Sequence, residues 1–367
     1  MSIHCRMKNQ ITKILSLVLM LISHAEASAQ NLENSTSKPA FVYQVEALSY
    51  FDNREYDADF QSAQTLFATR LSPEIGLQVQ DHHRLMLGAH YTQHMGRPFE
   101  SGDFVPTLYY RYQPSDEHFR MYLGAVPYTQ LSEDLPAYAL YDSIAYVHPN
   151  IQGALLQYQN DNLFVDAFCD WRSLPTDTQR EAFRLLLNAR YQDSYFHAGA
   201  LLSMNHLASK KFQKNGVCDD AFVNPTFGID LPWLDTLSLT AGYILAYQWD
   251  RIHASQPTLS QALVLDLHAR WKRFALKNSL YLGENLQPLY PQHGNALYLG
   301  DPFYQSSFYN RCDIYCYLIQ SKFVNCLFSW NLHYTKEFGW DHQQQLICRF
   351  STEALNQGKK LRNLFGK

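Results

Sequence analysis

The sequence LSLTAGYILAYQW, residues 237–249, decides the fold because its side chains alternate in character with a period of two. One set of alternate residues is apolar and ends in Tyr247 and Trp249, whereas the other set contains Ser238 and Gln248. Alternate residues of a β-strand point to opposite faces of the sheet. A long apolar row that ends in aromatic residues is typical of a strand facing lipid. A half-buried strand of a soluble sandwich would show a similar alternation.

The rest of the chain favours the membrane interpretation. Similar segments predict sixteen strands, near residues 40–52, 65–80, 84–95, 104–113, 119–129, 150–159, 163–172, 181–191, 195–207, 221–231, 237–250, 261–271, 274–284, 304–320, 324–335 and 343–353. The connections after even-numbered strands are short, and those after odd-numbered strands are long. Outer-membrane barrels alternate tight periplasmic turns with extended external loops in this way. We therefore predict an all-β fold, a transmembrane antiparallel β-barrel of about 16 strands.

Charged side chains separate from the apolar rows in the clearest strands. The apolar rows of residues 163–172, 183–191 and 263–271 carry no charge, and the opposite rows carry several. A charge on the lipid face near the midplane costs about 2–4 kcal/mol, so a membrane enforces this separation. The residues predicted to line the lumen are Arg84, Arg111, Arg120, Asp166, Asp170, Arg172, Arg184, Arg190, Asp266 and Arg270, together with Glu46, Glu74, Lys277, Asp313 and Arg349. They would either orient a solute or brace the wall as ion pairs.

The amino-terminal residues predict export. Residues 1–29 combine basic residues, a short apolar run at residues 14–22 and the small residues Ala27 and Ala29, as in a secretory signal peptide. The expected organisation is a signal peptide at 1–29, a periplasmic lead at 30–39, a barrel at 40–355 and a basic tail at 356–367. The expected location is the outer membrane.

Two long connections carry further predictions. Residues 130–149 contain Glu133, Asp134 and Asp142, and this third long loop resembles in rank, length and charge the loop that constricts general porins. An external flap is the alternative. Residues 285–303 are interpreted as a second plug or a sugar-binding lip.

The cysteines give no metal signature. No C-x-x-C pair occurs, and we expect no metal and no cofactor. Cys169, Cys312, Cys316 and Cys348 fall on apolar rows and are interpreted as small lipid-facing residues.

A search for catalytic motifs is negative. The sequence has no G-x-S-x-G, H-E-x-x-H, P-loop or dinucleotide-binding pattern, and no basic stripe for nucleic acid. Ser203 shares a row with His197, and Ser329 with His333, but both pairs lie on rows assigned to the lumen. We therefore expect no catalytic residues and no enzyme activity.

Four stretches carry a resemblance. LSPEIGLQ at 71–78, YDSIAYVHPNIQG at 141–153, FCDWRS with REAF within 168–183, and YLGDPFYQ at 298–305 resemble the porin-like outer-membrane β-barrels of Bacteroidota. Such barrels commonly finish with a terminal aromatic residue, whereas here Phe350 is followed by a tail that contains Phe365. The resemblance implies the fold and the location of the protein more than the identity of a transported solute.

Together these patterns predict a porin-like channel in outer-membrane lipid for passive diffusion of small hydrophilic solutes. One alternative is a plugged structural or surface-binding barrel, whose lumen would be filled by ion pairs. The other is a barrel enzyme that modifies lipid or lipopolysaccharide, which we would expect to present Ser and His outward near the rim.

Overall fold

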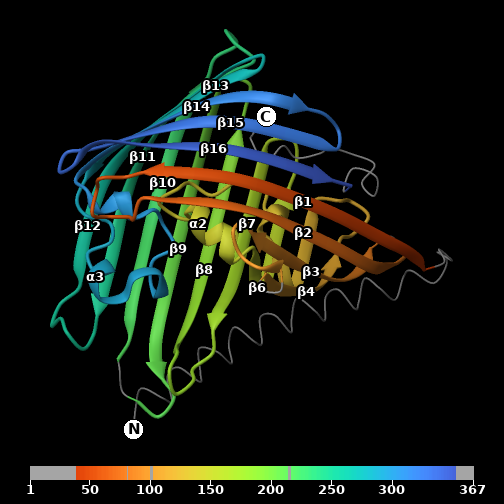
Figure 1. The fold of residues 1–367 in the computed structure, drawn as a ribbon, viewed down its shortest axis with the longest axis horizontal. Helices are drawn as coiled ribbons and strands as arrows, with labels where there is room; N and C mark the ends of the chain where they lie inside the picture. The colour runs from red at the N-terminus through yellow and green to blue at the C-terminus, as the bar shows by residue number, and fades with distance from the viewer. Residues whose placement is uncertain (1–38, 81, 100–101, 214–215, 353–367) are drawn as a thin grey trace.

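The protein forms a closed antiparallel barrel of sixteen strands (Figure 1). The computed structural model describes residues 39–80, 82–99, 102–213 and 216–352. The strands are β1 (Ala40–Glu55), β2 (Gln64–Val79), β3 (His83–His94), β4 (Asp103–Tyr112), β5 (Phe119–Pro127), β6 (Asn150–Gln159), β7 (Leu163–Ser173), β8 (Arg180–Gln192), β9 (Phe196–Lys210), β10 (Cys218–Asp230), β11 (Thr236–Asp250), β12 (Thr258–Trp271), β13 (Phe274–Gly283), β14 (Phe308–Gln320), β15 (Val324–Thr335) and β16 (Gly339–Ser351). Each strand pairs with its sequence neighbours, and β1 closes the barrel against β16. The predicted fold class and strand number are confirmed.

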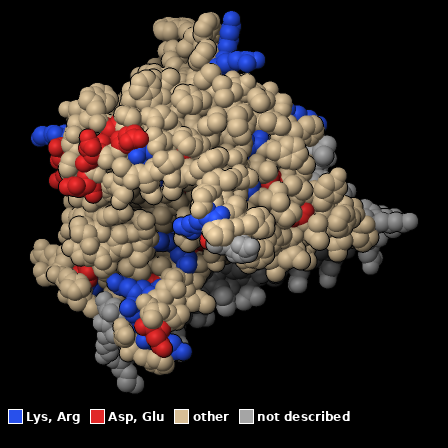
Figure 2. All heavy atoms as spheres, in the orientation of Figure 1, with Lys and Arg blue, Asp and Glu red and all other residues tan. Residues whose placement is uncertain are grey.

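The apolar rows face outward, as β11 shows. Leu239, Tyr243 and Leu245 are exposed, whereas Ile244 and Gln248 on the alternate row are buried. Figure 2 shows the same division at the surface, where charged residues gather in patches and leave broad areas without charge. An outward apolar band over an inward polar face is the arrangement of a transmembrane barrel. None of the helices in the described part of the chain is long and apolar enough to cross a membrane.

Within the described residues, the helices lie in two of the long connections. They are η2 (Tyr128–Gln130) and α2 (Asp142–Val147) after β5, and α3 (Tyr290–His293), η3 (Gly294–Ala296) and η4 (Pro302–Gln305) after β13. We call residues 128–149 the first plug segment and residues 284–307 the second plug segment, because both pack against inward-facing residues of the wall.

The first plug segment crosses the lumen between opposite walls. Near its start, the Ser132 hydroxyl donates to Asp166 Oδ1 on β7 at 2.6 Å. Near its end, the ring of Tyr146 stacks on Tyr50 of β1 with 4.0 Å between centroids. Its contacts therefore extend from β7 to β1.

The second plug segment pairs with the first. The Asp301 amide donates to the Ala137 carbonyl, and the Tyr141 amide donates to the Leu299 carbonyl, each at 2.8 Å. A cavity of about 20 Å³ remains where the two segments meet the wall near Tyr138. That volume has room for about one water molecule. The two segments thus occupy the lumen as a joined polar and aromatic filling.

The cysteine interpretation needs one correction. Cys348 on β16 forms a disulfide with Cys326 on β15, so it is not an isolated lipid-facing residue. The two cysteines are directly opposite in the β15–β16 register, which periodicity within one strand does not reveal. Cys169, Cys312 and Cys316 are half-buried free thiols. The predicted signal peptide, nearly all of the periplasmic lead and the whole predicted tail, including Phe365, lie outside the described residues, whereas Phe350 is an exposed residue of β16.

Candidate active site

Three side chains in the lumen form a hydrogen-bonded chain of the kind used for acyl transfer. The hydroxyl of Ser72 lies 2.7 Å from Nδ1 of His90, and Nε2 of His90 lies 2.9 Å from Oδ1 of Asn150. All three residues are buried, with 4–5% of their surfaces exposed. A hydroxyl, an imidazole and an orienting group in this sequence are the parts of an activated nucleophile.

Local structure explains why these residues meet. Ser72 lies on the inward row of β2, between the buried residues Arg70 and Glu74. The β2–β3 register pairs Leu71 with Tyr91, which places His90 across from Ser72 on the same face. Asn150 is the first residue of β6, directly after the first plug segment.

The hydrogen bonds fix the protonation pattern of His90. An amide oxygen only accepts hydrogen bonds, so Nε2 of His90 carries the proton that Asn150 Oδ1 accepts. In the neutral ring, Nδ1 then keeps a lone pair and accepts the hydroxyl proton of Ser72. His90 is therefore arranged as a general base toward Ser72.

Arg70 supplies a positive group beside this chain. It precedes Ser72 by two residues on the same inward row, and 6% of its surface is exposed. Its Nε and NH1 have no hydrogen-bond partner within the described part of the chain. Arg70 and Glu46 are the charged residues that act on His90. Unpaired N–H groups next to a nucleophile are suited to stabilise a developing oxyanion.

The barrel wall is incompletely paired directly outside this site. The register of β4 with β5 joins residues 109–112 to residues 121–124, and residues 103–108 have no β5 partner within the described chain. We call this gap, between residues 103–108 and residues 125–127, the β4–β5 seam. His90 pairs with Val105 on one side of it, and Asn150 pairs with Pro127 on the other. The His90–Asn150 hydrogen bond therefore bridges the seam from the luminal side.

An unpaired strand edge is unusual at membrane depth, because backbone groups without partners are costly in lipid. Pro106 on the β4 edge has no N–H to leave unpaired, and sheets accept proline at such edges. The outer borders of the seam are apolar, since Phe104, Leu108 and Leu123 are exposed. The seam thus joins an apolar outer surface to a polar luminal site.

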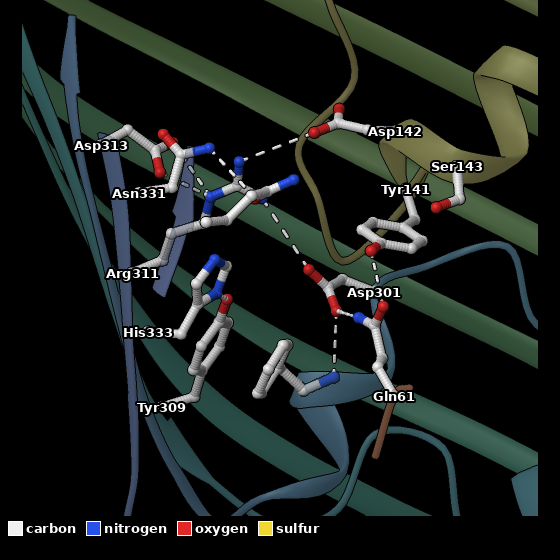
Figure 3. A network of polar contacts seen from close by, with 12 residues as sticks. Gln61, Tyr141, Asp142, Ser143, Asp301, Tyr309, Arg311, Asp313, Asn331 and His333 are labelled. Carbon is white, nitrogen blue, oxygen red and sulfur yellow. Dashed lines mark hydrogen bonds and ion pairs between the residues drawn. The ribbon is translucent and has the colours of Figure 1, made fainter. Parts of the chain in front are cut away.

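A second polar cluster joins both plug segments to the wall (Figure 3). Arg311 of β14 bonds Asp313 at 2.9 Å and lies 3.7 Å from Asp142 and 3.8 Å from Asp301. Gln61 donates to Asp301 at 2.6 Å. Because the contacts of Asp142 and Asp301 connect the plug segments to the wall and to a neighbouring loop, we assign this cluster to holding the plug segments in place.

The residues predicted to line a pore lie around the whole lumen and do not form one cluster. Glu133 of the first plug segment lies 3.5 Å from Arg190. Asp170 accepts a hydrogen bond from Tyr128 of that segment, and Arg172 donates to the Ala296 carbonyl of the second plug segment.

Another predicted pore-lining residue, Arg184, is fully buried beside Ser203. The remaining predicted residues on inward rows are Arg84, Arg111, Arg120, Asp166, Asp266 and Arg270, and Asp134 is a residue of the first plug segment.

The Ser and His pairs noted in the sequence are not bonded to each other. His197 contacts Asp230 and Thr240, and His333 contacts Tyr309. Sequence reasoning missed the Ser72–His90 pair because its members lie on different strands. Ser72 and Asn150 do lie within LSPEIGLQ and YDSIAYVHPNIQG, two of the stretches that carry the resemblance.

Comparison with known families shows to which family the chain belongs. The family model described as lipid A 3'-O-deacylase-type matches residues 33–362. The chain belongs to this family. The expectation that the protein is not an enzyme is therefore wrong, because the family is one of deacylases. The porin-like resemblance holds for the outer-membrane barrel and its location, which the family and the structural neighbours share.

A solved outer-membrane protein shows the same fold at low sequence identity. A loop L8 deletion mutant of OmpT, an outer membrane protein of Vibrio cholerae, superposes with a TM-score of 0.53 and 8% identity, covering 86% of this chain and 100% of that chain. A triple mutant of Rhodopseudomonas blastica porin has a TM-score of 0.47 and 9% identity, covering 85% and 100%. A search of curated proteins found no match. These likenesses concern fold alone.

Proposed function

We propose that this protein is an outer-membrane ester hydrolase that removes an acyl chain from lipid A, with Ser72 as its nucleophile. The observation that carries the proposal is the Ser72–His90–Asn150 chain behind the β4–β5 seam. Membership of the deacylase-type family supports the substrate class. The seam supports a lateral route, in which an acyl chain stays in apolar surroundings while its ester group reaches the lumen.

In the first half of the reaction, the Ser72 hydroxyl oxygen attacks the ester carbonyl carbon and His90 Nδ1 takes the hydroxyl proton. Asn150 keeps the ring oriented by accepting the Nε2 proton. The N–H groups of Arg70 stabilise the negative charge on the carbonyl oxygen. Collapse of the intermediate breaks the bond to the sugar oxygen, which leaves with the proton from His90.

In the second half, water attacks the acyl group on Ser72. His90 removes a proton from the water and returns one to the Ser72 oxygen, which releases the fatty acid. The net reaction consumes one water and yields one fatty acid and one lipid A that lacks one acyl chain.

The plug segments that fill the lumen argue against a diffusion channel. Both plug segments bond to each other and to the wall, for example through Asp301 and Arg311. If no deacylation is detected, the protein would be a plugged barrel without enzyme activity.

The test is deacylation of lipid A in mixed micelles by the purified barrel, followed by mass spectrometry of the lipid and the released fatty acid. Ser72→Ala and His90→Gln should each slow the reaction by about 10⁴-fold, because each removes a member of the nucleophilic chain. Asn150→Ala should lower kcat less, because Asn150 orients the ring and does not touch the substrate.

The matched control is His197→Gln, which alters a second buried luminal histidine with two hydrogen bonds. It should retain wild-type activity. If His197→Gln lost activity while His90→Gln kept full activity, the active site would instead be the Asp230–His197–Thr240 cluster. No deacylation by a folded wild-type barrel would contradict the proposal.

A further inference from the structure

A second group of reactive side chains converges at the end of the barrel that carries the long loops. Cys218 is the first residue of β10, and Asp250 is the last residue of β11, directly opposite it in the register. His293 is the last residue of α3 in the second plug segment. His253 follows Asp250 by three residues, in the loop after β11.

The potential ligand atoms of Cys218, Asp250 and His293 converge, and His253 contacts Asp250 from outside this group. Nε2 of His293 lies 3.1 Å from Sγ of Cys218 and 3.0 Å from Oδ2 of Asp250. Nδ1 of His253 lies 2.7 Å from the same Asp250 oxygen. The ligand atoms of Cys218, Asp250 and His293 all lie within 4.8 Å of one another. Cys218 and Asp250 are buried, whereas His253 is largely exposed, so a solvated ion can enter from the His253 side.

Hydrogen bonding does not account well for this arrangement. Nε2 of His293 carries at most one proton, yet it makes short contacts with both a thiol and a carboxylate. A single cation between Cys218, Asp250 and His293 satisfies these three groups together, since each then donates an electron pair to the same ion.

We propose that Cys218, Asp250 and His293 form a zinc site, with His253 hydrogen-bonded to Asp250 on the exposed side. Thiolate, imidazole and carboxylate are the ligands that Zn²⁺ takes in tetrahedral sites, and a thiolate disfavours Mg²⁺ and Ca²⁺. The backbone amides of Ile252 and His253 donate to the other oxygen of Asp250, which holds its carboxylate in place.

The zinc ion acts as a clamp between wall and plug. Cys218 and Asp250 belong to adjacent strands of the wall, whereas His293 belongs to the second plug segment. Binding of the ion in the folded state therefore stabilises the inserted position of that segment by mass action. This inference does not depend on the identity of the nucleophile, because none of the four residues belongs to the hydrolytic site.

The test uses the purified, folded barrel without reductant, so that the Cys326–Cys348 disulfide stays intact. After treatment with a chelator, the protein is titrated with Co²⁺ and then with Zn²⁺. One equivalent of Co²⁺ should produce the absorption of a thiolate-bound, four-coordinate ion, and Zn²⁺ should abolish it. Cys218→Ser should remove the thiolate band, and His293→Ala should weaken binding by about 100-fold or more.

Cys316→Ser is the matched control, because Cys316 is another free thiol of the barrel. It should bind Co²⁺ as the wild type does. Heat-modifiable migration on gels checks that each variant is folded. Amide exchange in residues 290–297 should slow on addition of Zn²⁺ in the wild type and not in His293→Ala.

No uptake of Co²⁺ by the folded wild type would overturn the site, as would binding that survives both Cys218→Ser and His293→Ala. Binding without slower amide exchange would overturn the clamp. Deacylation of lipid A is measured separately, and its presence or absence does not alter these outcomes.

Discussion

At the scale of single residues, the chemistry depends on groups that the barrel holds in polar contact away from lipid. Ser72 and His90 face each other across two strands, and Asn150 reaches them from a third. Arg70 adds a buried guanidinium with unpaired nitrogens. A buried polar group without a partner costs stability. Its retention beside a nucleophile favours a role in catalysis over a role in folding.

This account predicts the effect of replacing Arg70. Arg70→Gln should lower kcat by about 10²–10³-fold with little change in KM, because an oxyanion donor acts mainly in the transition state. The thermal stability should stay the same or rise, since buried N–H groups without hydrogen-bond partners are removed. Steady-state deacylation rates and a thermal melt measure the two effects.

Arg84→Gln is the control for Arg70, because Arg84 also faces the lumen but bonds Gln78. Its activity should equal that of the wild type. A loss of stability in Arg70→Gln with kcat unchanged would show that Arg70 is structural.

At the scale of elements, the β4–β5 seam connects the membrane with the lumen. The two strands pair only at the end with the short turns, and the unpaired part lies toward the long loops. Exposed Phe104, Leu108 and Leu123 border it on the outside. An acyl chain lying along these side chains would place its ester next to Ser72.

Narrowing the seam should therefore hinder lipid substrates selectively. Ala125 is a half-buried residue on the β5 side of the seam. Ala125→Trp should lower kcat/KM for lipid A by about 10-fold or more, an effect of the size expected when a bulky ring blocks an apolar contact. Hydrolysis of a short, water-soluble ester should change much less.

Ala167→Trp provides the comparison, because Ala167 is also half-buried and lies on the outward row of β7, away from the seam. It should leave both activities unchanged. Equal losses in the two variants would mean that general disturbance of the barrel, and not entry through the seam, is measured.

At the scale of the whole molecule, periodicity within single strands was enough to predict a sixteen-stranded barrel. The predicted strands lie within a few residues of those observed, with the largest shifts at the starts of β14 and β16. Contacts between distant segments were not predictable in this way. The Cys326–Cys348 disulfide and the Ser72–His90 pair depend on the register between strands, and the β4–β5 seam is an interruption of that register.

The filling of the lumen has an electrical consequence. Because the plug segments bond to each other and to the wall, the folded barrel should show no stable single-channel conductance in a planar bilayer. A variant in which residues 286–305 are replaced by a short Gly-Ser linker should conduct, since it lacks most of the second plug segment. Stable conductance of the wild type would restore the diffusion-channel interpretation.

The central claim is that Ser72 is a nucleophile activated by His90, and covalent labelling tests it most directly. The folded protein is treated with a long-chain fluorophosphonate, and the modified peptide is located by mass spectrometry. The account predicts a single adduct on Ser72 that disappears in His90→Gln and persists in His197→Gln. An unlabelled Ser72 in protein that deacylates lipid A, or an adduct on Ser143 or Thr240 instead, would contradict it.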